Sequence, residues 1–251
     1  MTALQAIGQR IVVRLVIGLM NWMRRSSRVG EGTFFDPDNF PWVEHVEAQG
    51  SLIRAELDEL LVDRDHLPNF QDISVEQTVL TRDDKWKTYI FYAYGERSDA
   101  NLGRCPDTAR VLAEIPGLKT AFFSILSPGK HIPAHTGPWS GVLRYHLGLR
   151  IPGPEGGCRI RVGDDIRPWV EGGSLIFDDT YNHEAWNDTD DIRVVLFVDF
   201  IRPLRFPANV VNLIILRAIQ VSPFITNSKQ RQLEWEKDFE RLLAGRRSDG
   251  K

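Results

Sequence analysis

The fold is decided by three stretches that read KTAFFSIL (residues 119–126), VLRYHLGL (residues 142–149) and RVVLFVDF (residues 193–200). In each stretch, residues that point to one face alternate with residues that point to the other, which is the two-residue period of a β-strand. Shorter runs of the same kind occupy residues 158–162 and 174–177, and turns rich in glycine and proline separate them. Many short strands at this spacing predict a mainly β fold with flanking helices, arranged as a β-sandwich or jelly roll.

The rest of the chain is organised around these strands in four segments. We expect a basic amphipathic helix in residues 1–30, a helical and mixed flank in residues 31–118, the jelly-roll core in residues 119–205, and an apolar and then a charged helix in residues 206–251. The two outer segments show the three- and four-residue spacing of apolar side chains that is typical of helices.

The composition excludes several classes of protein. The chain has 251 residues, 42% of them hydrophobic, and a formal net charge of -3. This balance disfavours a disordered chain and a basic nucleic-acid-binding protein, so we expect no nucleic-acid partner. The two cysteines, Cys105 and Cys158, are too few for a disulfide scaffold and are compatible with a reducing compartment.

Both ends of the chain have features of a membrane-surface protein. Residues 1–30 contain five arginines and no acidic residue, and their longest run without a charge, Leu15–Met23, has nine residues. A membrane-spanning helix needs about 20 apolar residues, so we expect no such helix here. Residues 207–226 are strongly apolar with Arg217 as their single charge. The two segments predict either a membrane-facing patch or a pair of helices that pack on each other.

Polar side chains occur on the predicted strands and turns where a plain core would not place them. His135 and His183 lie in polar turns, Arg144 and His146 share one strand face, and Arg193 begins the last long strand. Two histidines and one carboxylate form the metal site of non-haem Fe(II) oxygenases. In such sites the first histidine is normally followed two residues later by Asp or Glu.

Here that position holds Gly137. The residues alone leave open whether Asp178, Asp179 or water would complete the coordination shell of a bound metal ion.

Several motifs in order resemble the catalytic domain of the aspartyl/asparaginyl β-hydroxylase family. The matching motifs are His135-Thr136-Gly137-Pro138, Leu143-Arg144-Tyr145-His146-Leu147-Gly148-Leu149, Cys158-Arg159-Ile160-Arg161, Phe177-Asp178-Asp179, His183-Glu184-Ala185-Trp186 and residues 193–199. The resemblance implies a double-stranded β-helix and an Fe(II)- and 2-oxoglutarate-dependent dioxygenase. The family has glycine where the carboxylate ligand usually sits, so Gly137 agrees with the resemblance.

The resemblance also implies roles for individual residues. His135 and His183 would bind Fe(II), with positions left for water, 2-oxoglutarate and O2. Arg193 would pair with the distal carboxylate of 2-oxoglutarate, because a guanidinium matches a carboxylate with two parallel hydrogen bonds.

Three further residues would complete the cosubstrate site. Ser124 would add a hydrogen bond to the distal carboxylate, and Arg144 and His146 would steady the metal-binding end. The implied reaction converts 2-oxoglutarate to succinate and CO2 while an unactivated C–H bond is hydroxylated.

The family contains enzymes that act on Asp or Asn side chains and bacterial relatives that hydroxylate lipids such as lipid A and ornithine lipids. The apolar and basic chain ends favour the lipid branch, and residues 34–42, 68–74 and 222–224 look more like the lipid-acting relatives. We therefore expect 2-hydroxylation of a lipid acyl chain, at the inner face of the cytoplasmic membrane, by a peripheral cytoplasmic protein. Trp86 and Trp186 are possible substrate contacts.

Two alternatives remain. A peptide or protein hydroxylase would turn over 2-oxoglutarate with a peptide and without detergent. A non-catalytic jelly-roll binding module would bind no iron and form no succinate.

Overall fold

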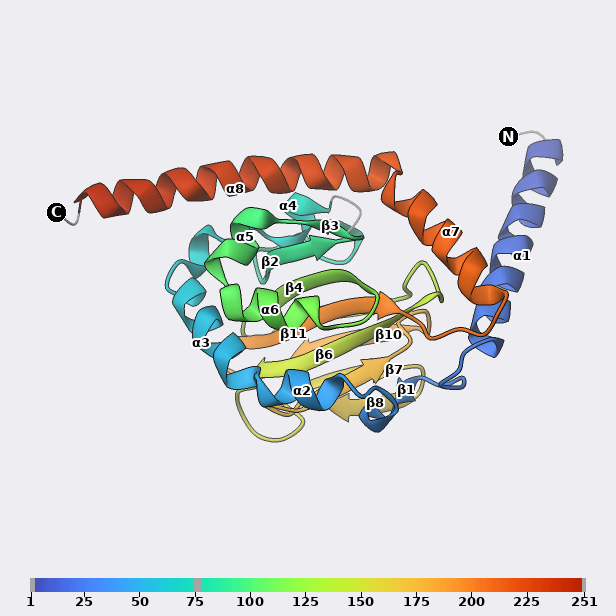
Figure 1. The fold of residues 1–251 in the computed structure, drawn as a ribbon, viewed down its shortest axis with the longest axis horizontal. Helices are drawn as coiled ribbons and strands as arrows, with labels where there is room; N and C mark the ends of the chain where they lie inside the picture. Colours follow the sequence, from blue (N-terminus) through green and yellow to red (C-terminus); the bar gives the residue numbers. More distant parts are fainter. Residues whose placement is uncertain (1–2, 75–77, 250–251) are drawn as a thin grey trace.

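The structure, a computed structural model, describes residues 3–74 and 78–249, which form two antiparallel β-sheets with helices around them (Figure 1). The larger sheet contains, in spatial order, β1 (Phe34–Phe35), β9 (Ser174–Phe177), β6 (Val142–Arg150), β11 (Arg193–Ile201), β4 (Leu118–Leu126), β2 (Trp86–Ala93) and β3 (Glu96–Arg97). The smaller sheet contains β5 (Lys130–His135), β10 (His183–Asn187), β7 (Cys158–Val162) and β8 (Asp165–Pro168). The chain passes repeatedly between the sheets, so the predicted mainly β jelly-roll fold is confirmed.

Strand alternation gives the larger sheet two different buried faces. One face carries the side chains of residues such as Phe123, Leu147 and Leu196, which belong to the main hydrophobic core. The other face carries Leu126 and Val195, which pack with side chains of the smaller sheet in a second core. A side chain's position along the strand therefore decides whether it faces the helices or the space between the sheets.

Helices from the first half of the chain cover the outer face of the larger sheet (Figure 1). These helices are α2 (Val43–Ala48), α3 (Gly50–Leu61), α5 (Asp99–Arg104) and α6 (Pro106–Ala113), and the short α4 (Phe70–Ile73) lies near β2. Their apolar faces, for example Ile53 and Leu57 on α3, are buried against the sheet. The segment 31–118 also supplies β1, β2 and β3, so the larger sheet extends beyond the expected core of residues 119–205.

The chain ends form three long helices at the edge of the molecule. α1 (Ala3–Arg25) and α7 (Ala208–Gln220) lie side by side, and α8 (Pro223–Asp249) runs past α4 and α5 (Figure 1). Met23 of α1 is fully buried in a small cluster with Ala208 and Leu216 of α7. No helix in the described part of the chain has both the length and the apolarity of a membrane span.

Candidate functional site

Two histidines of the smaller sheet lie next to each other. His135 ends β5, His183 begins β10, and the two residues are cross-strand partners. Their ring centroids are 4.1 Å apart. The structure therefore brings together the two residues that the sequence predicts as metal ligands.

One extra residue in β5 makes this pairing possible. Ala185 lies two residues after His183 in β10. Their partners in β5, Ile132 and His135, are three residues apart, so β5 contains one extra residue between the two pairs. Ile132 is buried between the sheets, so in a regular strand His135, three residues later, would point to the opposite face. The β-bulge at residues 133–134 turns His135 back toward His183.

The hydrogen bonds of the two imidazoles fix which ring nitrogen carries the proton. His135 Nδ1 lies 2.8 Å from the carbonyl oxygen of Pro133, and His183 Nδ1 lies 3.0 Å from that of Tyr181. A carbonyl only accepts hydrogen bonds, so both Nδ1 atoms carry the proton. Each Nε2 is left with a lone pair, which is the arrangement of a metal-binding histidine.

Burial keeps both imidazoles neutral. It lowers the pKa of His135, and it lowers the pKa of His183 to about 3, with the neighbouring His135 contributing to the latter shift. Neutral imidazole is the form that binds metal ions, so the electrostatics agree with the hydrogen bonds.

Packing around Gly137 explains why no carboxylate follows His135. A Cβ atom at Gly137 would lie 2.1 Å from Asp179 Oδ2, and the Gly137 N–H donates to the Asp179 carbonyl at 2.7 Å. The Asp178 carboxylate is engaged elsewhere, by buried Arg202 and by Arg24. Of the two aspartates left open by the sequence, Asp179 lines the cavity beside His135.

The donor set fits a metal ion held by two protein nitrogens. Within residues 3–74 and 78–249, no three His, Cys, Asp or Glu side chains are grouped to hold a metal ion. His135 and His183 alone would leave several coordination positions for water and small ligands. Imidazole nitrogens suit iron, zinc, copper and nickel, so the geometry accommodates the predicted Fe(II).

Arg193 is a buried cation without a counter-charge. It is 2% exposed, and it takes part in none of the ion pairs formed among the described residues. Its guanidinium lies 4.2 Å from the Trp169 ring centroid, and Nη1 makes long contacts of 3.4 Å to the carbonyl oxygen and 3.5 Å to the hydroxyl oxygen of Ser124. Burial lowers the pKa of Arg193 to about 9. A bound anion would offset the free-energy cost of burying this charge.

Other buried polar groups near Arg193 also lack partners in the described part of the chain. These are both ring nitrogens of His146, the indole Nε1 of Trp169 and the hydroxyl of Thr88. Burial lowers the pKa of His146, and the positive charge of Arg193 acts in the same direction. Trp169 was not among the predicted site residues, because it follows β8 in a segment that shows no alternating pattern. Thr88 was not among them either, although Trp86, Thr88 and Ile90 alternate on one face of β2.

Arg144 shares the inner face of β6 with His146, as predicted, but it is already held by two carboxylates. Its Nε and Nη2 donate to Asp199 at 2.8 and 3.1 Å, and Nη2 lies 2.9 Å from Asp179. Burial raises the pKa of Asp179, and the positive charge of Arg144 opposes this shift. Asp199 was not among the predicted site residues, although it lies two residues after Phe197 and six after Arg193 on one strand, an even spacing that places all three on the same face.

Of the two tryptophans predicted as possible substrate contacts, Trp86 lies inside the barrel and Trp186 lies outside it. Trp86 lines the cavity, and its Nε1 donates to Ser124 Oγ at 3.1 Å. Trp186 instead stacks on His131 on the outer face of the smaller sheet, with a centroid distance of 5.1 Å. The structure therefore brings Trp86, but not Trp186, to the site.

A cavity of about 390 Å³ opens beside His135. The ionisable side chains in its lining are His135, Arg144, Asp179 and Asp199. Most of the other walls are apolar, including Phe70, Ile73, Trp86, Ile90, Phe122, Phe197 and Ile225. This size is typical of a small-molecule site, and its polar groups include His135 and its neighbours.

Comparisons with known proteins agree with the motifs. The ornithine lipid ester-linked acyl 2-hydroxylase of Rhizobium tropici is 43% identical over 91% of this chain and 83% of its own length. The human aspartyl/asparaginyl β-hydroxylase is 37% identical over 47% of this chain, but that match covers only 16% of the human protein. Among solved structures, a prolyl-4-hydroxylase of Pseudomonas putida matches 61% of this chain and 87% of its own, with 16% identity and a TM-score of 0.39.

The sequence model of the aspartyl/asparaginyl β-hydroxylases matches residues 47–203, which include every strand from β2 to β11. Because this match covers more than half of the chain and contains both histidines and Arg193, the chain belongs to the aspartyl/asparaginyl β-hydroxylase family.

Proposed function

We propose that this protein is an Fe(II)- and 2-oxoglutarate-dependent dioxygenase that hydroxylates C-2 of a lipid acyl chain at a membrane surface. The observation that carries the proposal is the buried guanidinium of Arg193, which pairs with no carboxylate among the described residues, in the same barrel as two neutral histidines that carry their proton on Nδ1. A dianionic cosubstrate that binds a metal at one end and an arginine at the other matches this arrangement.

Each end of the cosubstrate would have its own set of protein groups. Fe(II) bound at His135 and His183 would supply the oxidising chemistry that couples 2-oxoglutarate oxidation to C–H hydroxylation. Arg193 and Ser124 would hold the distal carboxylate, replacing the long contact between them by charge-assisted hydrogen bonds. His146 would donate or accept at the other end, where its nitrogens have no partner in the described structure.

Arg144 would act as a rigid positioning group. Asp199 and Asp179 hold its guanidinium from two directions, so the side chain has little freedom at the cavity edge. The two carboxylates, together with Tyr94, keep Arg144 charged and raise its pKa, although burial acts against this. We propose that Arg144 orients the metal-binding end of the cosubstrate and that apolar walls such as Phe122 exclude water there.

An acyl chain suits the cavity better than an aspartate or asparagine side chain. Apolar side chains provide most of its walls, and its charged groups are few. The lipid-acting relative from Rhizobium tropici also aligns with 91% of this chain, whereas the peptide-type family member from human aligns with 47%. Both observations favour a lipid over the alternative peptide substrate.

The chain ends would place the enzyme on the membrane. Five apolar residues of α1 and three of α7 are exposed: Val12, Val13, Leu15, Val16, Ile17, Val210, Leu213 and Ile214. Below, these residues are called the apolar surface of α1 and α7. Arg14, Arg25 and Arg28 are exposed nearby in sequence and would meet anionic headgroups. We propose peripheral binding to the inner face of the cytoplasmic membrane.

The test is 2-oxoglutarate turnover after anaerobic loading with Fe(II), followed by oxygen, with and without membrane lipid extract. Wild type is compared with His183→Ala, Arg193→Ala and a control, Arg97→Ala, whose exposed side chain pairs only with Asp99 among described residues. Succinate that requires His183 and Arg193, rises with lipid and accompanies a lipid mass gain of one oxygen supports the proposal.

Two results would contradict it. Succinate that requires both residues but ignores lipid points to a peptide hydroxylase. A protein that binds no Fe(II) and forms no succinate is a non-catalytic binding module.

A further inference from the structure

The cavity beside His135 is separated from a second, smaller cavity by a thin apolar wall. The second cavity has a volume of about 50 Å³ and lies under the first turns of α8. Five residues line both cavities: Ile73, Ile90, Ala93, Ile225 and Ser228. The first four of these are called the end wall below.

The register of the larger sheet builds an apolar floor from the site to the end wall. His146 of β6 pairs with Phe197 of β11, Phe197 with Phe122 of β4, and Phe122 with Ile90 of β2. The rings of Phe122 and Phe197 stack with centroids 4.1 Å apart. This row crosses three interstrand spacings, about 14 Å in all. It gives an extended chain a straight apolar path across the sheet.

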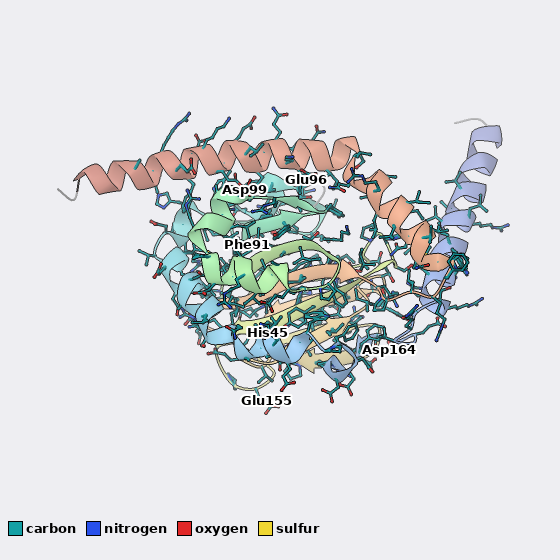
Figure 2. The ribbon with its side chains drawn as sticks, in the orientation of Figure 1. His45, Phe91, Glu96, Asp99, Glu155 and Asp164 are labelled. Carbon is teal, nitrogen blue, oxygen red and sulfur yellow. The ribbon has the colours of Figure 1, made fainter. Side chains whose placement is uncertain are left out.

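Charge is concentrated at the two ends of this path. At the site end, the ionisable side chains of the first cavity are His135, Arg144, Asp179 and Asp199, and the Arg144 guanidinium lies 4.2 Å from the Phe197 ring centroid. Beyond the end wall, the second cavity is lined by charged residues that include Glu96 and Lys229, which pair with each other at 2.5 Å. Glu96 is labelled in Figure 2, next to α8. An acyl tail is therefore stabilised along the row and meets polar surface once it passes the end wall.

The end wall itself is firmly packed. Ile73, Ile90 and Ile225 are 4%, 6% and 3% exposed, and they come from three different elements, α4, β2 and α8. Ala93 is the small member of the wall, so its position is where added volume would intrude on the path. Close packing of this kind resists deformation, so a longer chain would not simply push the wall aside.

We propose that the end wall terminates the acyl-chain channel and sets the longest chain that the enzyme hydroxylates efficiently. This inference rests on the proposed lipid hydroxylation. Two substitutions act on it in opposite directions. Ile225→Ala joins the two cavities and extends the channel, whereas Ala93→Phe fills the channel before its end.

The experiment offers the Fe(II)-loaded enzyme 2-oxoglutarate, O2 and an equimolar mixture of synthetic ornithine lipids with ester-linked acyl chains of increasing length. Mass spectrometry reports the gain of one oxygen for each length. Ile225→Ala is expected to shift the preferred length upward, and Ala93→Phe downward, with at least a tenfold change in the ratio of long to short products.

Matched controls separate channel shape from general damage. Ile115→Ala removes a side chain that is 4% exposed, close to the 3% of Ile225, but lies in the core away from both cavities. Ala55→Phe adds the same volume at an exposed position on α3. Both controls are expected to keep the wild-type length profile. If Ile225→Ala does not fold by circular dichroism, Ile225→Val takes its place and is expected to give a smaller upward shift.

The outcomes distinguish this inference from the function on which it rests. A wild type that oxidises no lipid of any length overturns the proposed function. A wild type that oxidises lipids, with the same length profile in Ala93→Phe and in the Ile225 variant, overturns the end wall alone.

Discussion

At the scale of single residues, Gly137, two positions after His135, is constrained by space rather than by backbone conformation. A methyl group at Gly137 would overlap the Asp179 carboxylate, which Arg144 holds in place. Gly137→Ala is expected to lower the free energy of unfolding by about 1–3 kcal/mol, the usual cost of overpacking. It is also expected to weaken iron binding, because the Asp179 segment leads directly to His183.

Thermal unfolding and an iron titration by calorimetry measure these effects. Gly103→Ala is the control, since a Cβ there meets nothing within 4 Å and Gly103 is exposed in helix α5. An iron affinity that is unchanged in Gly137→Ala would show that the site tolerates a side chain there.

Arg193 illustrates how a binding residue can reduce the stability of the empty protein. Replacing it by Met removes a buried charge that no described residue neutralises, so Arg193→Met is expected to raise the free energy of unfolding by about 1–3 kcal/mol. The same variant should lose stabilisation by 2-oxoglutarate, which reaches about 2.7 kcal/mol at a ligand concentration of 100 Kd in the wild type.

Urea unfolding with and without 2-oxoglutarate, in the presence of iron, checks both parts. Arg97→Met, at an exposed position, should keep the ligand-induced shift. Retention of that shift in Arg193→Met would exclude Arg193 as the carboxylate partner.

The sequence predicted the residues whose position follows from a motif and missed those whose position follows from three-dimensional packing. His135 and His183 come from matching motifs, and the structure pairs them. Trp186 is three residues after His183 in a regular strand, so alternation alone places it on the other face. Trp169 contacts Arg193 from a loop, and no local sequence pattern predicts such a contact.

At the scale of secondary-structure elements, α1 and α7 pack on each other, which is one of the two alternatives left open by the sequence, and they also leave apolar side chains exposed. Their inner residues, such as Met23 and Leu216, pack on each other, while Leu15 and Ile214 remain 68% and 65% exposed. Burying one such side chain in a membrane contributes about 1.5–3 kcal/mol. Leu15→Asp and Ile214→Asp are therefore each expected to weaken binding to anionic vesicles by about 10- to 100-fold.

Vesicle sedimentation checks this prediction, with Val62→Asp, at a residue 80% exposed near α3, as the control. Point substitutions are preferable to deleting residues 1–28, because Arg24 in that segment pairs with Asp178 near the metal-binding histidines. Equal sedimentation of all three variants and wild type would contradict membrane binding through the apolar surface of α1 and α7.

The predicted elements agree with the structure best where the pattern is local. The alternating runs at residues 119–126, 142–149 and 193–200 became β4, β6 and β11, and the helical and mixed flank expected in residues 31–118 contains α2 and α3. Strand β2 was not predicted, and its place beside β4 depends on pairing with residues 29 to 40 positions away. A pattern in a short stretch of sequence does not indicate such long-range pairing.

At the scale of the whole molecule, each of the two main hydrophobic cores contains one cysteine. Cys105 lies in the core under the helices and Cys158 in the core between the sheets. Burial raises the pKa of Cys105 to about 12 and also raises that of Cys158. Both thiols are expected to resist alkylation at neutral pH until the protein unfolds.

Pulsed alkylation along a urea series, read by mass spectrometry, tests whether the two cores unfold as one unit. A single cooperative domain predicts the same urea midpoint for both cysteines. Labelling of Cys158 at a distinctly lower urea concentration than Cys105 would show that the inter-sheet core, with the metal site, opens independently.

The bulge in β5 also bears on what a shorter strand would lose. Removing Pro133 would place His135 two positions after Ile132, on the same buried face, and would restore regular pairing of β5 with β10. The side chain would still face His183, but it would lose the carbonyl of Pro133 that accepts a hydrogen bond from its Nδ1. The extra residue of β5 thus fixes the tautomer and the ring orientation of His135, and a barrel without it would keep both histidines but lose this control over His135.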